Sequence, residues 1–124
     1  MKNYFNKIAL LVIVSIAFSA CAAVVVGGAA AYTYVSGWLK KDYHTGIKKA
    51  YNASIKAVEE NDLEIIEKGQ DITYAYIKAK GAKRDIRIKL NRRSKSVTSV
   101  SIRVGVMGDR KAAKIIHDSI ADLL

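Results

Sequence analysis

Basic side chains recur at alternate positions in two short segments of the chain, and this spacing offers the clearest chemistry in the sequence. Arg87 and Lys89 alternate with isoleucine and leucine, and Arg103 alternates with isoleucine and valine. Because successive side chains of a β-strand point to opposite faces, these three are expected on the exposed face of a sheet. With Arg92 and Arg93, which we place in the adjoining turn, they form a predicted polyanion-binding surface.

Two tyrosines would add aromatic side chains to that surface if they lie on the same face. The segment Ile72 to Lys80 is ambiguous, because its pattern does not settle whether Tyr74 and Tyr76 or the residues between them are buried. If the tyrosines share the basic face, ring stacking complements the charge, as on surfaces that bind single-stranded nucleic acid or sugar polymers. The alternative is a basic exterior that lies against anionic lipid or lipopolysaccharide. The formal net charge of +10 fits both.

The residues that catalysis would require are sparse. A nucleophilic enzyme needs a nucleophile, a base and a group that orients the base, and nothing in the sequence ties His44 or His117 to a particular serine and aspartate. We interpret both histidines as structural or surface residues. The acidic residues between Glu59 and Glu67 lack the alternating Asp/Asn loop of a calcium site. We therefore predict a protein that is not an enzyme, with no metal site, no cofactor and no small-molecule substrate.

The single cysteine, Cys21, carries the prediction of where the protein resides. Lys2 and Lys7 accompany an apolar run from Ile8 to Ala17, which is typical of a bacterial export signal. The following Phe18-Ser19-Ala20-Cys21 resembles a lipobox, in which the cysteine sulfur is acylated and the chain is cut just before it, with Phe18 where an aliphatic residue is usual. We predict a lipoprotein signal peptide at residues 1–20 and acyl chains on Cys21 that hold the protein on membrane lipid.

Two alternatives for this segment remain open. No charged residue occurs from Ile8 to Leu39, and this stretch exceeds the roughly 20 apolar residues that span a bilayer, so one alternative is an inner-membrane signal anchor with a periplasmic domain. The other is cleavage after Ala22 by an ordinary signal peptidase. For the lipoprotein, Ala22 replaces the Asp that marks inner-membrane retention in enteric bacteria, which favours the outer membrane, facing the periplasm. All three interpretations place the domain in the cell envelope or beyond.

The remainder of the chain is expected to form one small domain. The sequence has 124 residues, of which 51% are hydrophobic, and this is too apolar for a disordered chain. Residues 21–31 are predicted to be an apolar tether and residues 32–124 a single α+β domain. We predict a two-layer sandwich in which both helices lie on one face of an antiparallel sheet of about five strands, in the order β-α-β-β-β-β-α.

Hydrophobic periodicity and turn residues define the expected elements. One strand is predicted from Tyr32 to Tyr43, with Gly37 as a bulge. Helices are predicted over 45–61 and 109–123, where apolar residues recur at intervals of four, four and three, and Asp109 is the expected N-cap of the second. The four strands between the helices are separated by predicted turns at Lys68-Gly69-Gln70, Lys80-Gly81-Ala82 and Asn91 to Ser94.

Several short motifs resemble those of one protein family. They are Tyr34-Val35-Ser36-Gly37 with Leu39 and Tyr43, Tyr51 and Ala57 in the first helix, and Ser101-Ile102-Arg103-Val104-Gly105 with Gly108-Asp109 before the last helix. In these features the chain resembles a family of small bacterial lipoproteins catalogued only as a domain of unknown function. The resemblance covers nearly the whole mature chain. It implies a lipid-anchored α+β domain in the cell envelope, with no activity assigned.

These observations favour a lipid-anchored envelope protein that acts as a binding or structural module. Its expected partners are membrane lipid, through acylated Cys21, and an anionic envelope polymer or an envelope protein. The alternative is a polyanion-binding factor for nucleic acid, lipopolysaccharide or a cell-wall polymer, which would use the basic sheet face.

Overall fold

The computed structural model describes residues 32–124 of the chain. The predicted signal peptide (1–20) and the predicted tether (21–31), with Cys21, lie outside the described residues. No helix of the described part is long and apolar enough to cross a bilayer. The elements are, in chain order, β1 (Thr33–Val35), β2 (Trp38–Tyr43), α2 (Ile47–Glu60), β3 (Glu64–Gln70), β4 (Tyr74–Lys80), β5 (Asp85–Ser94), β6 (Val97–Val104) and α3 (Arg110–Asp122).

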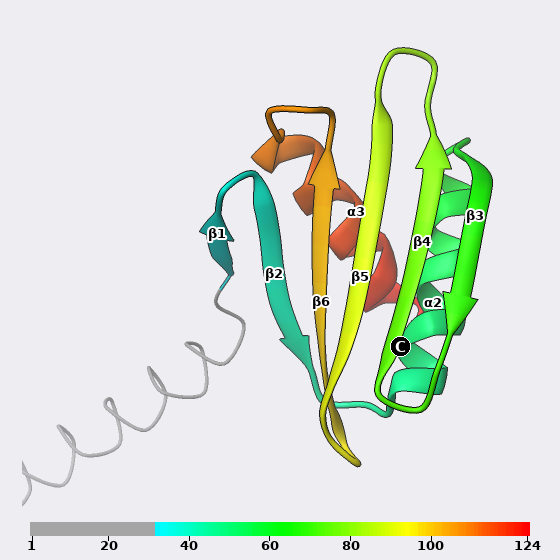
Figure 1. Cartoon of the computed structure of the whole chain (residues 1–124), viewed down its shortest axis with the longest axis vertical. Helices are drawn as coiled ribbons and strands as arrows, with labels where there is room; N and C mark the ends of the chain where they lie inside the picture. Colours follow the sequence, from blue (N-terminus) through cyan, green and yellow to red (C-terminus); the bar gives the residue numbers. More distant parts are fainter. Residues whose placement is uncertain (1–31) are drawn as a thin grey trace, which may run out of the picture. The chain divides into compact units, whose positions relative to one another are not determined.

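One six-stranded sheet carries both helices on the same face (Figure 1). The strands lie in the order β1-β2-β6-β5-β4-β3, and every neighbouring pair is antiparallel. Helix α2 crosses the sheet, because it follows β2 near one edge and leads to β3 at the other. Helix α3 packs on β6 and β2 and against α2. The predicted α+β two-layer sandwich is confirmed.

The segment predicted as one strand from Tyr32 to Tyr43 is a hairpin. Ser36 and Gly37 have φ angles of 52° and 85°, and two successive positive values are the mark of a type I′ turn, whose twist matches that of the flanking strands. Strand β1 pairs with β2 from Thr33 opposite Lys40 to Val35 opposite Trp38. Gly37 therefore forms a turn rather than a bulge, the sheet has one strand more than predicted, and the order is β-β-α-β-β-β-β-α.

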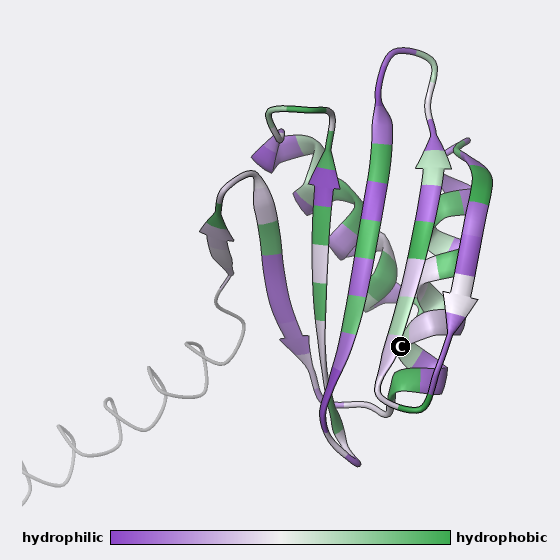
Figure 2. Cartoon of the chain, viewed as in Figure 1, coloured by the Kyte–Doolittle hydropathy of each residue, from purple (hydrophilic) through white to green (hydrophobic). Residues whose placement is uncertain are grey.

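Alternation along β5 separates a buried face of the sheet from an open one. Ile86, Ile88 and Leu90 are buried against the helices, whereas Arg87 and Lys89 between them are exposed. Figure 2 shows this as bands of opposite hydropathy along β5. The predicted exposed face on this strand is therefore present.

The same alternation on β4 resolves the ambiguous segment from 72 to 80. Ala75, Ile77 and Ala79 are buried with exposures of 1% or less. Tyr74 and Tyr76 alternate with them and lie on the open face. The two tyrosines thus share the face that carries Arg87 and Lys89, because β4 pairs directly with β5.

Small side chains allow α2 to pack closely. Of the apolar residues that recur at intervals of four, four and three in the predicted helix 45–61, Tyr51 and Val58 are buried, and Ile47 and Ile55 are only partly buried. The other buried positions of the helix are Ala50, Ala53, Ser54 and Ala57. The helix thus faces the core with a surface of mostly small residues, which bring its backbone near the sheet and α3.

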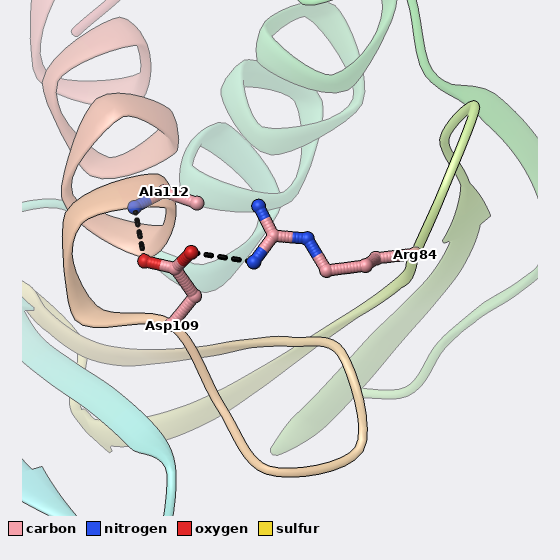
Figure 3. Close-up of polar contacts among 3 residues, drawn as sticks. All are labelled: Arg84, Asp109 and Ala112. Atoms are coloured by element: carbon pink, nitrogen blue, oxygen red, sulfur yellow. Dashed lines mark hydrogen bonds and ion pairs between the residues drawn. The ribbon is translucent and has the colours of Figure 1, made fainter.

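The start of α3 agrees with the sequence prediction. Asp109 is its N-cap, and its side chain accepts a hydrogen bond from the backbone N–H of Ala112 (3.1 Å), as Figure 3 shows. The second carboxylate oxygen of Asp109 pairs with the guanidinium of Arg84 at 2.5 Å. Arg84 belongs to the β4–β5 connection, so one carboxylate joins that connection to the start of the last helix.

Two predicted turns lie elsewhere. Lys68-Gly69-Gln70 is the end of β3, and the chain turns after it, between Gln70 and Tyr74. Asn91 to Ser94 belongs to β5, and the turn lies at Lys95 and Ser96. Both strands continue beyond the apolar core with polar residues, and that is why composition alone indicated turns there.

Candidate polyanion-binding face

The open face of the sheet brings three basic residues into one row. Arg103 on β6 lies opposite Arg87 on β5, and Arg87 lies opposite Lys78 on β4. Neighbouring strands are about 4.8 Å apart, and like charges directly opposite each other destabilise a sheet. An anion bound across the row would relieve that repulsion.

The charge of this row is only partly neutralised within the described part of the chain. Residues 32–124 contain the ion pairs Lys78–Glu67 (3.3 Å), Arg84–Asp109 (2.5 Å) and Arg93–Asp42 (3.9 Å). Arg87, Lys89 and Arg103 take part in none of them. The guanidinium of Arg103 donates a hydrogen bond to the backbone oxygen of Val106, which holds it in place without cancelling its charge.

Two tyrosines add aromatic surface beside the basic row. The rings of Tyr74 and Tyr76 have centroids 6.2 Å apart and planes inclined by 29°. Tyr76 lies opposite Gly69 of β3, where an added Cβ would come within 2.5 Å of the tyrosine ring. The Tyr76 hydroxyl donates to Glu67 at 3.1 Å, and this hydrogen bond raises the pKa of Tyr76. The absence of a side chain at Gly69 leaves room for the Tyr76 ring, and the hydrogen bond to Glu67 fixes the orientation of that ring.

A tryptophan on β2 contributes a third ring. The Nζ atom of Lys89 lies 4.4 Å from the centroid of the Trp38 ring, in a cation–π contact. Trp38 precedes Leu39, whose partner on β6 is Ile102, so the ring lies beside the row that contains Arg103. This contact between β2 and β5 passes over β6, and it joins the aromatic and basic parts of the surface.

We call this surface the basic face. It consists of five basic and three aromatic residues, which are Lys40, Lys78, Arg87, Lys89, Arg103, Trp38, Tyr74 and Tyr76. Sequence reasoning did not identify Trp38, Lys40 or Lys78. Trp38 and Lys40 alternate around the buried Leu39, a signal that becomes readable only when β2 is separated from β1.

Of the two arginines predicted in the turn, one lies on the open side and one does not. The register between β5 and β6 shifts between Arg92 and Ser94. Arg93 pairs with Asp42 on the open side. Arg92 lies opposite the buried Thr98, on the side of the helices, where it borders a hollow with Ile47. The prediction that both adjoin the basic surface is wrong for Arg92, because β5 continues through this segment and its alternation continues with it.

Neither histidine belongs to the basic face. His44 is exposed, and His117 is fully buried. The Nε2 atom of His117 lies 2.7 Å from the backbone oxygen of Leu39, which can only accept, so Nε2 carries the proton and Nδ1 faces the hydroxyl of Tyr43 at 2.8 Å. Burial lowers the pKa of His117 to about 4. The neutral imidazole therefore ties α3 to β2, a structural role.

The described residues hold no group of three or more His, Cys, Asp or Glu side chains that could bind a metal ion. The acidic residue of the predicted cluster that touches the basic face is Glu67. It contacts Lys78 and Tyr76 and so forms one border of the face.

Comparison with known protein families matches residues 6–123 to the family described as "Protein of unknown function (DUF3568)". The chain belongs to this family. The match includes the apolar segment and Cys21 as well as the whole sheet. No curated protein matches the chain.

Proposed function

We propose that this protein is a lipid-anchored module of the cell envelope whose basic face binds an anionic polymer. The observation that carries the proposal is the placement of Arg87 directly opposite Arg103, with no carboxylate paired to either in residues 32–124. Such a pair costs stability in the free protein. A bound polyanion would remove the repulsion between the two arginines, and the free energy so recovered would add to the binding free energy.

The form of the face favours a polymer over a small ligand. The face crosses four neighbouring strands, β2, β6, β5 and β4, so its width is about 14 Å at the usual strand spacing. It is an open sheet surface with rings at both sides, Trp38 on β2 and the tyrosines on β4. An extended chain can contact the basic row and both sets of rings at once, and repeated ionic contacts add over its length.

The predicted location selects the type of polymer. The positive residues Lys2 and Lys7, the uncharged stretch that follows and Cys21 support export and acylation of the cysteine. In the envelope, the abundant anionic polymers are lipopolysaccharide and cell-wall polymers, which carry sugar rings. Aromatic side chains pack against the apolar faces of sugar rings while cations pair with the anionic groups. We therefore propose an anionic envelope glycan and leave nucleic acid as an outcome of the test.

The experiment compares three soluble probes with the full-length protein in detergent. Heparin serves as an anionic glycan, dextran as a neutral glycan and oligo-dT as single-stranded nucleic acid. We expect saturable binding of heparin that weakens steeply as salt is raised, weaker binding of oligo-dT and no binding of dextran. Tighter binding of oligo-dT than of heparin would overturn the choice of a glycan.

Matched charge reversals locate the binding surface. The variant Arg87→Glu/Lys89→Glu changes two exposed residues of the basic face, and Lys111→Glu/Lys114→Glu changes two exposed residues of α3 by the same net charge. The first variant should lose most of the heparin affinity and the second should keep it. Equal losses in both variants would mean that overall charge, and not the basic face, binds the polymer.

A further inference from the structure

Two of the most exposed apolar side chains in the described domain are neighbours in one loop. Val106 and Met107, between β6 and α3, are 87% and 90% exposed. Glycines with φ angles of 75° and 83°, Gly105 and Gly108, stand on either side of them. An added Cβ on Gly108 would overlap Gly37 of the β1–β2 turn, so the loop lies directly against that turn.

The loop is held in place on each side of its exposed residues. The backbone N–H of Gly105 donates to the oxygen of Asp85 at 2.8 Å, and Arg103 donates to the oxygen of Val106. Asp109 caps α3 immediately after the loop. These contacts fix the backbone while both apolar side chains remain in water, which favours an interaction with a partner outside the domain.

Basic residues line a hollow on one side of the loop. A hollow of about 400 Å³ beside Val106 is lined by five basic residues, Lys80, Lys83, Arg84, Arg87 and Arg103, and by one acidic residue, Asp85. They come from the ends of β4, β5 and β6 and from the β4–β5 connection. An apolar tip next to a concentration of positive charge matches the interface of an anionic bilayer, where acyl chains lie just below phosphate groups.

We propose that this end of the domain docks on an anionic membrane, with Val106 and Met107 in the interface and lipid phosphate groups in the basic hollow. The docking end, as we call it, consists of the β1–β2 turn (36–37), the β4–β5 connection (81–84) and the β6–α3 loop (105–109), which lie together at one end of the strands (Figure 1).

The position of the chain's entry into the domain agrees with this orientation. Strand β1 has three residues and runs directly into the β1–β2 turn, so Thr33 lies only about 10 Å from the docking end. Ten residues separate Cys21 from Tyr32, and they can span at most about 33–36 Å. This step rests on the proposed membrane attachment, and it keeps the docking end within reach of the bilayer surface.

Docking in this way engages Arg87 and Arg103, which line the hollow, and leaves the rest of the basic face accessible, including Lys89, Trp38 and the two tyrosines. The strands would then run roughly perpendicular to the membrane plane, because the docking end lies at one end of the strands. The open side of the sheet would then face the aqueous space, where an envelope glycan can approach it.

Single-tryptophan reporters in the full-length protein test the proposal. Trp38 is the sole tryptophan, so Trp38→Phe provides a silent background for Met107→Trp at the docking end. Ile72→Trp is the matched control, because Ile72 is also an exposed apolar residue (73%) and lies in the β3–β4 turn at the opposite end. Both proteins are reconstituted in vesicles of phosphatidylcholine with brominated acyl chains, with or without phosphatidylglycerol.

We expect several-fold stronger bromine quenching of the Met107→Trp reporter than of the Ile72→Trp reporter in vesicles that contain phosphatidylglycerol. Adding Lys83→Glu, at an exposed position of the β4–β5 connection outside the basic face, should reduce that quenching. Equal quenching of the two reporters, or quenching that phosphatidylglycerol does not increase, would overturn the docking proposal. Flotation of the same samples reports attachment separately, so failure of the anchor and failure of docking give different results.

Discussion

Arg87 and Arg103 lie directly opposite each other on the open side of the sheet, in the row of the basic face that is nearest the docking end. Lys78 continues their row, and Lys89, the next residue of β5 on the same side, lies over the ring of Trp38. Positive charge is concentrated in this row, and neither Arg87 nor Arg103 is paired with a carboxylate in residues 32–124. We propose that a ligand supplies the missing negative charge.

A first prediction concerns the cost of that arrangement. The substitution Arg87→Thr removes a cation with like charges on both neighbouring strands and introduces a residue that favours strands. We expect it to raise the free energy of unfolding by about 0.2–1 kcal/mol and to weaken heparin binding. Urea denaturation gives the first quantity. Arg93→Thr is the control, since Arg93 is paired with Asp42, and it should bring no gain in stability.

A second prediction concerns pH. The pKa of His117 is about 4 in the folded protein, against an ordinary value of 6.5. Between these values the unfolded chain binds more protons than the folded one, so stability is complete above pH 6.5 and falls as pH is lowered to 4. The loss attributable to His117 is on the order of 3 kcal/mol.

The variant His117→Gln should remove most of this pH dependence, because it retains an amide donor near the oxygen of Leu39 but does not titrate in this range. His44→Gln, at an exposed position, should leave it unchanged. Urea midpoints measured from pH 4 to 7 test both. The same slope in His117→Gln as in the wild type would assign the pH dependence to other groups.

A third prediction concerns a glycine of the docking end. Gly108 has a φ of 83° and lies against Gly37, so Gly108→Ala should destabilise the domain by at least about 1–3 kcal/mol. Gly46→Ala should have a much smaller effect, since an added Cβ there lies 3.5 Å from its nearest neighbour, an ordinary contact. Thermal melts of the two variants compare them. Equal melting temperatures would show that the β1–β2 turn and the β6–α3 loop are not packed as described.

A fourth prediction concerns Cys21. Intact mass spectrometry of the protein extracted from membranes should give a chain that begins at Cys21 and carries added acyl mass. Cys21→Ser should appear in the soluble fraction. A full-length, unmodified mass would instead identify a signal anchor, with Phe18 as the departure from the lipobox that misled the prediction.

Much of this fold could be predicted because its signals are local. The alternation of β5 and β6 and the capping aspartate of α3 depend on neighbouring residues only, and the structure has them as expected. The β1–β2 hairpin was missed because its turn is Ser36-Gly37, and serine at a position with positive φ is not one of the usual type I′ signals.

The candidate site was only partly predictable, because it is assembled across strands. Arg87, Lys89 and Arg103 follow from the pattern within β5 and β6. Lys78 and Trp38 belong to the basic face through the register of β4 with β5 and of β2 with β6. The pairing of two strands that are distant in the sequence cannot be inferred from the residues of either strand alone. Composition and spacing therefore could not predict that Lys78 and Trp38 belong to the basic face.

The most direct test of the central proposal uses the fluorescence of Trp38. This single tryptophan lies on the basic face beneath Lys89, and a polymer bound there would draw the ammonium group away from the ring and cover the indole. Titrating the full-length protein with heparin should change the Trp38 emission saturably, and the change should be absent in Arg87→Glu/Lys89→Glu under the same conditions. Binding of heparin, measured independently, without any change in Trp38 emission would place the polymer elsewhere and contradict the account.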